Sequence, residues 1–185
     1  MEPASTSRLL TAEDYFYEPD DDLRCELVAG EVLREPQPGP EHEWLSRKVA
    51  YYLQRFLNEH RLGRLLGAAG YILERDPDTV RGPDESFVSE ERWAGKLDKR
   101  KYFEGAPDLA VEVASPDDSR RKLAEKARSY LAAGARLVWV FWPKRRTVDV
   151  YRPGSPPVTL TASDTLDGGD VLPGFTLPVA RIFED

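Results

Sequence analysis

The stretch Ala106-Pro-Asp-Leu-Ala-Val-Glu-Val-Ala-Ser-Pro116 decides the fold of this chain of 185 residues. Its centre, Leu109 to Ala114, is apolar at every position except Glu112. A short apolar run bounded by prolines is typical of a buried strand. A carboxylate there is costly to bury unless it is paired, protonated or metal-bound, so Glu112 is a candidate functional residue. Two alternatives stay open: a solvated face of an edge strand, or a pair with a buried arginine.

The segment that follows predicts a helix and a second buried strand. The helix spans about Asp118 to Ala133, with apolar residues on its inner face and Gly134 well placed to end it. The run Leu137-Val-Trp-Val-Phe-Trp142 reads as the strand. We interpret its aromatics Trp139, Phe141 and Trp142 as exposed side chains that serve either the core or an interface. This strand-helix-strand passage needs a crossover connection.

The segment before the central strand predicts the longest helix and a hairpin. Apolar residues recur at three- and four-residue spacing from Glu41 to Arg61, and Gly63 ends the pattern. Cys25 to Val28 and Glu31 to Leu33 flank Ala29-Gly30, which favours a two-residue turn. Cys25 is the single cysteine, so no internal disulfide or thiolate cage can form, and we expect it to be a small core residue.

The other elements are shorter. Residues 17–22 are acidic and predict a loop. The remaining predictions are a short helix starting at the capping-box-like Thr11-Ala-Glu-Asp14, strands at Leu65 to Leu73 and Glu85 to Val88, a loop or short helix at Ser89 to Gly105, a strand at Val148 to Tyr151, and short strands in the tail to Phe183.

Together these elements predict the fold class α/β (α+β), in which helices flank a central mixed β-sheet. An N-terminal hairpin precedes this core and a short-stranded C-terminal tail follows it. The length suits one domain over residues 1–185. The hydrophobic content of 41% is enough for a real core, so the chain reads as globular and not as disordered.

Composition and charge limit the function classes. The net charge is -7, with 33 acidic against 26 basic residues, which argues against non-specific coating of nucleic acid. It does not exclude a nuclease, because a local basic stripe can still face a phosphate backbone. Met1 to Thr11 holds no long apolar run and no stretch approaches 18 apolar residues, so we expect no signal peptide, no membrane partner and a cytoplasmic location.

Asp84 is the predicted partner of Glu112. It follows Pro83 at the start of a strand. If that strand and the Glu112 strand are antiparallel neighbours, the start of one lies beside the end of the other. Neighbouring strands are about 4.8 Å apart, so both carboxylates can bind one divalent cation. The alternative is that Asp84 only caps a turn after proline.

Asp108 shares the strand and the face of Glu112. At about 3.3 Å per residue their Cα atoms are about 13 Å apart, too far to bind one ion directly. Asp108 is therefore either an acid of a supporting shell or second site, or a turn residue after Pro107.

Four further residues are candidates for the site, Lys126 as a catalytic residue and Tyr130, His42 and Glu26 in supporting roles. Lys126 and Tyr130 lie four apart on one face of the second helix. A lysine near a scissile phosphate can neutralise developing charge, although a solvated lysine is an open alternative. His42 lies either near the site or at an exposed helix start. Glu26 either adds an acid to the cluster or is an ordinary hairpin residue.

These residues resemble the Uma-two family of restriction-endonuclease-like proteins, within the PD-(D/E)XK nuclease superfamily. The resemblance runs in order through nearly the whole chain. The matching segments are Cys-Glu26-Leu-Val-Ala-Gly30-Glu31, Pro-Glu-His42-Glu, Pro83-Asp84, Ala-Pro-Asp108-Leu-Ala-Val-Glu112-Val-Ala-Ser115-Pro116, Lys126 with Tyr130 and Gly134, Val138-Trp139-Val140, and Leu172-Pro-Gly-Phe175.

The resemblance implies a Mg²⁺- or Mn²⁺-dependent endonuclease that hydrolyses phosphodiester bonds of DNA and leaves a 5′-phosphate. Asp84 and Glu112 match the two acids, which would hold the metal with the carbonyl of Val113. Ala114 stands where the superfamily pattern has its lysine. In the family the following helix supplies that lysine, which assigns the role to Lys126.

Two rival hypotheses stay open. One is a catalytically inactive nuclease-fold module that binds nucleic acid or a protein partner. The other is a dimerising domain in which Asp84, Glu112 and Lys126 do not converge. The sequence identifies neither the nucleic-acid substrate nor the oligomeric state, and a homodimer stays open.

Overall fold

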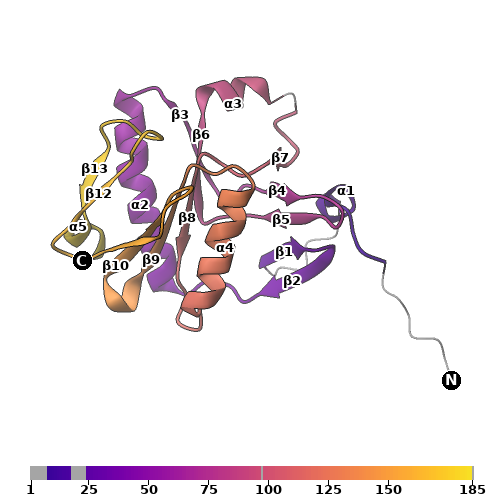
Figure 1. Ribbon diagram of the computed structural model, residues 1–185, viewed down its shortest axis with the longest axis horizontal. Coiled ribbons are helices and arrows are strands. Elements are labelled where there is room, and N and C mark those ends of the chain that lie inside the picture. The colour runs from indigo at the N-terminus through magenta and orange to yellow at the C-terminus, as the bar shows by residue number, and fades with distance from the viewer. Residues whose placement is uncertain (1–7, 18–23, 97, 185) are drawn as a thin grey trace.

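A computed structural model describes residues 8–17, 24–96 and 98–184. Within them, the central element is a six-stranded sheet in the order β11-β10-β9-β8-β6-β3 (Figure 1). Its strands are β3 (Gly63–Gly67), β6 (Glu85–Ser89), β8 (Leu109–Val113), β9 (Leu137–Trp142), β10 (Thr147–Tyr151) and β11 (Val158–Leu160). The central strand β8 pairs antiparallel with β6 and parallel with β9, so the sheet is mixed.

A smaller sheet lies beside the large one, with the order β2-β1-β5-β4-β7 in the described residues. It contains β1 (Arg24–Val28), β2 (Glu31–Glu35), β4 (Tyr71–Glu74), β5 (Thr79–Arg81) and β7 (Phe103–Glu104). The helices are α1 (Ala12–Phe16), α2 (Pro40–Glu59), α3 (Glu90–Gly95), α4 (Arg120–Ala132) and α5 (Val179–Phe183), with a 3₁₀ turn at Pro143–Arg145 and a ribbon of β12 (Thr165–Asp167) and β13 (Thr176–Pro178).

Helices cover both faces of the large sheet. In β8, Leu109, Val111 and Val113 pack in the core that contains α2, whereas Ala110 and the residue after the strand, Ala114, pack in the core that contains α4. Burial on both faces explains why the strand shows no alternation of polar and apolar residues. It also fixes the direction of Glu112, which shares the α4 face with Ala110 and Ala114.

Local sequence accounts for the helix ends and the hairpin turn. Ala29 and Gly30 both have positive φ, 50° and 79°, as a two-residue hairpin turn of type I′ requires. Thr11 and Asp14 form a reciprocal capping box at the start of α1. Ser119 caps α4 by accepting a hydrogen bond from the amide of Lys122, and Gly134 follows the helix with φ 102°.

The prediction of one strand from Leu65 to Leu73 is wrong. The segment divides into β3 and β4, which belong to different sheets. Ala68 has φ 47° at the break, and a Cβ on Gly70 would lie 2.2 Å from the Tyr102 ring. The chain therefore leaves the large sheet at a bend formed by Ala68, and the Tyr102 ring leaves no room for a side chain at Gly70. It returns through Gly82-Pro83, between β5 and β6.

Three other expectations also need correction. Trp139 and Phe141 are fully buried and Trp142 nearly so, because β9 is covered on both faces. Cys25 is partly exposed rather than a core residue, since it lies in the hairpin. The tail ends in α5, whose Ile182 and Phe183 pack in the α2 core. Of the predicted loop at 17–22, all but the first residue lies outside the described residues.

No helix in the described part of the chain has both the length and the apolar character needed to cross a membrane.

The packing of α2 against the sheet predicts a large loss of stability on truncation of Leu53. This side chain is fully buried in the α2 core, so Leu53→Ala should lower the free energy of unfolding by about 2–5 kcal/mol. Urea unfolding followed by circular dichroism measures it. Arg55→Ala, on the exposed side of the same helix, should change stability by less than about 0.5 kcal/mol. Equal effects of the two variants would contradict this packing.

Candidate active site

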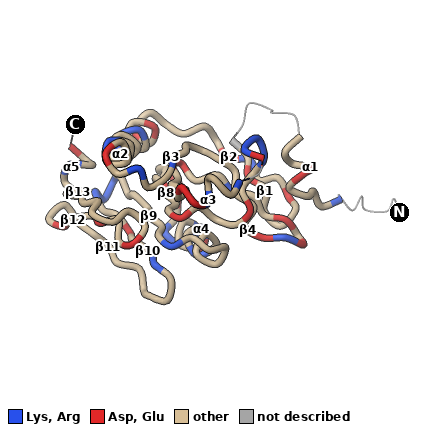
Figure 2. Tube along the Cα trace, turned by 90° about the horizontal axis from the view of Figure 1, so that it is seen from above, with Lys and Arg blue, Asp and Glu red and all other residues tan. Residues whose placement is uncertain are grey.

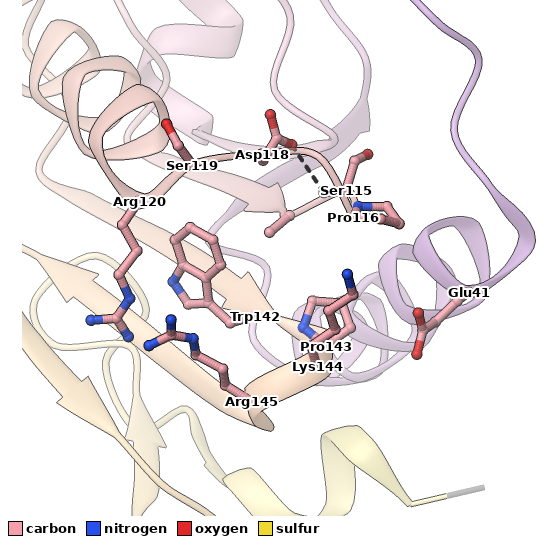
Figure 3. A pocket seen from close by; sticks show the side chains of 11 residues that line it. Glu41, Ser115, Pro116, Asp118, Ser119, Arg120, Trp142, Pro143, Lys144 and Arg145 are labelled. Carbon is pink, nitrogen blue, oxygen red and sulfur yellow. Dashed lines mark hydrogen bonds between the residues drawn. The ribbon is translucent and has the colours of Figure 1, made fainter.

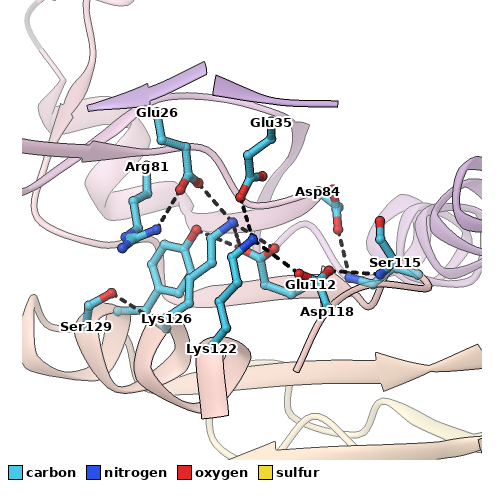
Figure 4. Close-up of polar contacts among 12 residues, drawn as sticks. Glu26, Glu35, Arg81, Asp84, Glu112, Ser115, Asp118, Lys122, Lys126 and Ser129 are labelled. Atoms are coloured by element: carbon cyan, nitrogen blue, oxygen red, sulfur yellow. Dashed lines mark hydrogen bonds and ion pairs between the residues drawn. The ribbon is translucent and has the colours of Figure 1, made fainter. Parts of the chain in front are cut away.

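The candidate site lies where the two sheets meet, at the end of β8 and the start of β6 (Figure 4). Glu85 is paired with Val111, so the antiparallel register brings Asp84 to the Glu112 end of β8. A cavity of about 140 Å³ opens there, and its walls include Asp84, Glu112, Lys126 and His42. The predicted convergence of the two acids with the helix lysine is therefore confirmed, and the hypothesis that the three residues do not converge is wrong.

Glu112 is buried, with 3% of its surface exposed. The Tyr130 hydroxyl donates a hydrogen bond of 2.8 Å to Oε1, and the Lys126 ammonium donates one of 3.0 Å to Oε2. Burial raises the pKa of Glu112 to about 7, opposed by the positive charge of Lys126 and reinforced by the charges of Asp84 and Glu26. The side chain is thus not on a solvated face, and its buried cationic partner is a lysine instead of an arginine.

Lys126 is the cation shared by the buried acids. Its ammonium lies 2.9 Å from Glu26 Oε1 and 3.0 Å from Glu112 Oε1. Burial opposes the charged form of the lysine, but Glu112 and Glu26 outweigh burial and raise the pKa of Lys126 above its ordinary value. Lys126 is therefore an ammonium at neutral pH, and the reading of it as a solvated lysine is wrong.

Glu26 is an internal member of the site and not an ordinary hairpin residue. Its Oε2 accepts a hydrogen bond of 2.6 Å from Arg81, and its Oε1 faces Lys126. Figure 4 shows the resulting row of alternating charge from Arg81 through Glu26 and Lys126 to Glu112. The sequence reasoning missed Arg81. The available signal was a charged residue directly before Gly-Pro-Asp84, at the end of a short β-branched pair Thr79-Val80.

Asp84 connects β6 to β8 and to the start of α2. Its Oδ2 accepts a hydrogen bond of 2.7 Å from the amide of Val113 and lies 3.2 Å from His42 Nε2. The acceptor contact crosses between strands, so Asp84 does more than cap its own turn. His42 is buried, with 5% of its surface exposed, which corrects the alternative of an exposed histidine at the helix start.

The rim of the cavity holds a second ionic cluster that the sequence reasoning did not assign. Lys122 lies 2.8 Å from Glu35 Oε1 and 3.2 Å from Asp118 Oδ1. Asp118 also accepts a hydrogen bond of 2.9 Å from the amide of Ser115. This cluster joins the end of β2 to the start of α4, one helical turn from Lys126.

Asp108 does not join the site. It lies at the other end of β8, where its Oδ2 accepts a hydrogen bond of 2.9 Å from the amide of Ser89. Arg92 and Arg136 lie 3.7 Å from its carboxylate. Glu112 lies four positions further along the strand, so Asp108 neither supports the site nor only forms a turn after Pro107: it anchors β8 to the end of β6.

The donor set fits a hard divalent cation. Asp84 and Glu112 present carboxylate oxygens to one cavity, and the negative charge of Asp84 contributes to the raised pKa of Glu112. In the part of the chain that the structure describes, no three His, Cys, Asp or Glu side chains form a ready metal cage. Two carboxylates completed by backbone oxygen and water suit Mg²⁺, which keeps several waters, better than a transition metal held by side chains alone.

The mixed sheet with helices on both faces, and acids at adjacent ends of antiparallel strands, defines a restriction-endonuclease-like fold. A solved structure shares it: the "crystal structure of a putative nuclease belonging to DUF820 from Anabaena variabilis ATCC 29413" matches with a TM-score of 0.82 and 20% identity, over 94% of this chain and 97% of that one. At this identity the likeness shows the fold alone.

The family follows from a match over residues 12–180 to the model described as "Uma2: Putative restriction endonuclease". The chain belongs to this family, which confirms the resemblance found in the sequence. No curated protein matches the chain.

The raised pKa of Glu112 predicts how stability depends on pH in metal-free buffer. The carboxyl has a pKa of about 7 in the folded chain against 4.5 for the ordinary group, so between these values the folded state binds the extra proton. The free energy of unfolding of the wild type, relative to that of Glu112→Gln, should therefore fall as pH rises from about 5 to 7.5, by at most about 1.4 kcal/mol per pH unit. Urea unfolding over this range measures it. Glu125→Gln, which changes an exposed residue of α4, is the control. If the difference in free energy of unfolding between wild type and Glu112→Gln did not change with pH, the raised pKa of Glu112 would be contradicted.

The position of Asp108 predicts a structural effect without an effect on Glu112. Asp108→Ala leaves the Ser89 amide without its acceptor and should cost about 1–3 kcal/mol of stability. Carbon-13 NMR titration should show an unchanged pKa of Glu112. Asp84→Asn is the comparison, because loss of its charge should lower that pKa. A changed pKa of Glu112 in Asp108→Ala would contradict this prediction, because it would show that Asp108 contributes to the electrostatics of the site.

Proposed function

We propose that the chain is a metal-dependent nuclease that hydrolyses phosphodiester bonds of DNA. The observation that carries the proposal is the convergence of Asp84, Glu112 and Lys126, from three different elements, on one cavity. Two acids and a lysine are the residue types needed to hold a cation beside a phosphate and to stabilise the charge that develops there. Family membership supports the same class of activity.

Asp84 and Glu112 would hold Mg²⁺ or Mn²⁺, with the carbonyl of Val113 as a further oxygen ligand. When bound, the cation would polarise the phosphate and lower the pKa of its water. Tyr130 fixes the orientation of Glu112 through a hydrogen bond of 2.8 Å, and His42 lies 3.2 Å from the Asp84 carboxylate. Both are positioning residues, because they act through the acids.

Lys126 supplies positive charge at the cavity wall. Its raised pKa keeps it protonated at neutral pH, so it stabilises negative charge and does not accept a proton. The rigid helix α4 and the two neighbouring carboxylates hold the ammonium in place before substrate arrives. This arrangement compensates for Ala114, which stands at the usual lysine position of the superfamily pattern.

A second candidate function is a nuclease-fold module that binds nucleic acid or a protein partner without cutting it. The observation that favours it is the double pairing of Lys126. Its ammonium contacts both Glu26 and Glu112, so the charge meant for a phosphate is already balanced inside the fold. Cleavage then requires that substrate and cation draw Lys126 and Glu112 apart.

A cleavage assay separates the two functions. Purified protein should cut duplex, branched or single-stranded DNA when Mg²⁺ or Mn²⁺ is added, and excess EDTA should stop the reaction. Lys126→Met should lower kcat by about 10²–10³ by loss of charge stabilisation. Glu112→Gln should bind Mn²⁺ more weakly in calorimetry and cut at least as slowly as Lys126→Met.

Glu125→Gln is the matched control, since it removes an exposed acid from α4. It should cut at the wild-type rate. Binding of labelled DNA without cleavage of any form, with either metal, would favour the second candidate. Cleavage that survives Glu112→Gln, with the folded state checked by circular dichroism, would contradict the proposed site.

A further inference from the structure

A second and larger cavity adjoins the candidate active site. Its volume is about 390 Å³, and it lies between the end of β8, the start of α4 and the 3₁₀ turn after β9 (Figure 3). Ser115 and Asp118 line both this cavity and the active-site cavity. A ligand in one is therefore a direct neighbour of a ligand in the other.

Basic side chains outnumber acidic ones in the lining of this cavity. Arg120, Lys144 and Arg145 contribute three cations, against the acids Glu41 and Asp118. Lys144 and Arg145 have no hydrogen-bond or ion-pair partner among the described residues, whereas Asp118 already contacts Lys122. The chain as a whole is acidic, with its charges interspersed along the fold (Figure 2). The cavity thus presents two cations that pair with no carboxylate of the described residues.

Arg120 lies against two buried neighbours, Trp142 and Asp149. Its guanidinium carbon lies 5.5 Å from the centre of the Trp142 ring, and it faces Asp149 at 3.8 Å. The Trp142 indole donates a hydrogen bond of 2.8 Å to Asp149, which also accepts one of 2.6 Å from Thr159. The guanidinium of Arg120 therefore lies beside Trp142 and Asp149 while 46% of its side chain stays exposed and open to a ligand.

The three cations reach the cavity from two sides. In Figure 3, Arg120 and Arg145 extend beside the Trp142 indole, while Lys144 points toward Pro116. Guanidinium groups match phosphate oxygens in paired hydrogen bonds, and an ammonium adds a point charge. This set of cations suits an anion with several oxygens, and its recognition needs no particular nucleobase.

We propose that this cavity binds a backbone phosphate of the substrate strand next to the phosphate that is cut. The inference rests on the proposed nuclease function. The two cavities share Ser115 and Asp118, and a strand carries a phosphate at every nucleotide, so a strand with one phosphate at the Asp84–Glu112 cavity would extend its neighbouring phosphates along the adjoining one. Contacts of this kind set the register of the strand and carry no sequence preference.

The test compares two double variants with equal charge loss. Lys144→Ala/Arg145→Ala removes the two unpartnered cations. Arg55→Ala/Arg181→Ala removes two cations from a separate cavity between α2 and α5. Binding of fluorescein-labelled duplex and single-stranded DNA is measured by anisotropy with Ca²⁺ present and the Glu112→Gln change in every protein, over a range of salt concentrations.

The first variant should bind DNA about tenfold more weakly, with a salt slope lower by about one. The second should bind like its parent. In cleavage assays with the natural Glu112, the first variant should raise KM and leave kcat within about twofold. Lys144→Arg/Arg145→Lys, which keeps both charges, should restore most of the affinity.

Failures of the two proposals are distinguishable. Equal weakening by both double variants would overturn the inference, because only net charge would matter. Wild-type cleavage with unchanged KM in Lys144→Ala/Arg145→Ala would overturn it while the nuclease function stands. Selective weakening of DNA binding supports the inference even if no protein cuts DNA. Absence of any DNA binding by the parent overturns it.

Discussion

The structure depends on one buried ammonium shared by two carboxylates. Lys126, from α4, contacts Glu26 from the small sheet and Glu112 from the large sheet. Loss of Lys126 would leave the buried Glu112 carboxylate without its cationic partner, at a cost of about 3–5 kcal/mol. The contact joins both sheets and the helix at one point. The same contact therefore holds the fold together and sets the electrostatics of the candidate site.

The shared ammonium of Lys126 also affects the chemistry of the candidate site. Burial and nearby acids raise the pKa of Glu112, and the ammonium opposes that effect. A divalent cation held by Asp84 and Glu112 would compete with Lys126 for the carboxylate. The proposed reaction thus uses charges that balance one another when no ligand is bound. The basic cavity beyond Ser115 and Asp118 offers a separate electrostatic contribution to binding, outside this balanced cluster.

Much of the site could be predicted because its geometry follows from local periodicity. Antiparallel pairing with a start-to-end offset places Asp84 beside Glu112, and helical spacing of four residues places Tyr130 with Lys126. The strand rise likewise separates Asp108 from Glu112. The roles of Glu26 and His42 stayed open and Arg81 was missed, because their contacts join residues up to about a hundred positions apart, for which local spacing holds no information.

The sequence by itself determined the order of most elements, the buried strand with its one acid, and the family. These follow from local patterns: apolar runs, helical spacing, and turn residues such as Ala29-Gly30. Only the tertiary structure decided that the strands divide between two sheets, with crossings near Gly70 and Gly82. It also decided that Lys126 is buried between two acids. Both outcomes depend on which distant surfaces pack together, and that is set by the free energy of the whole core.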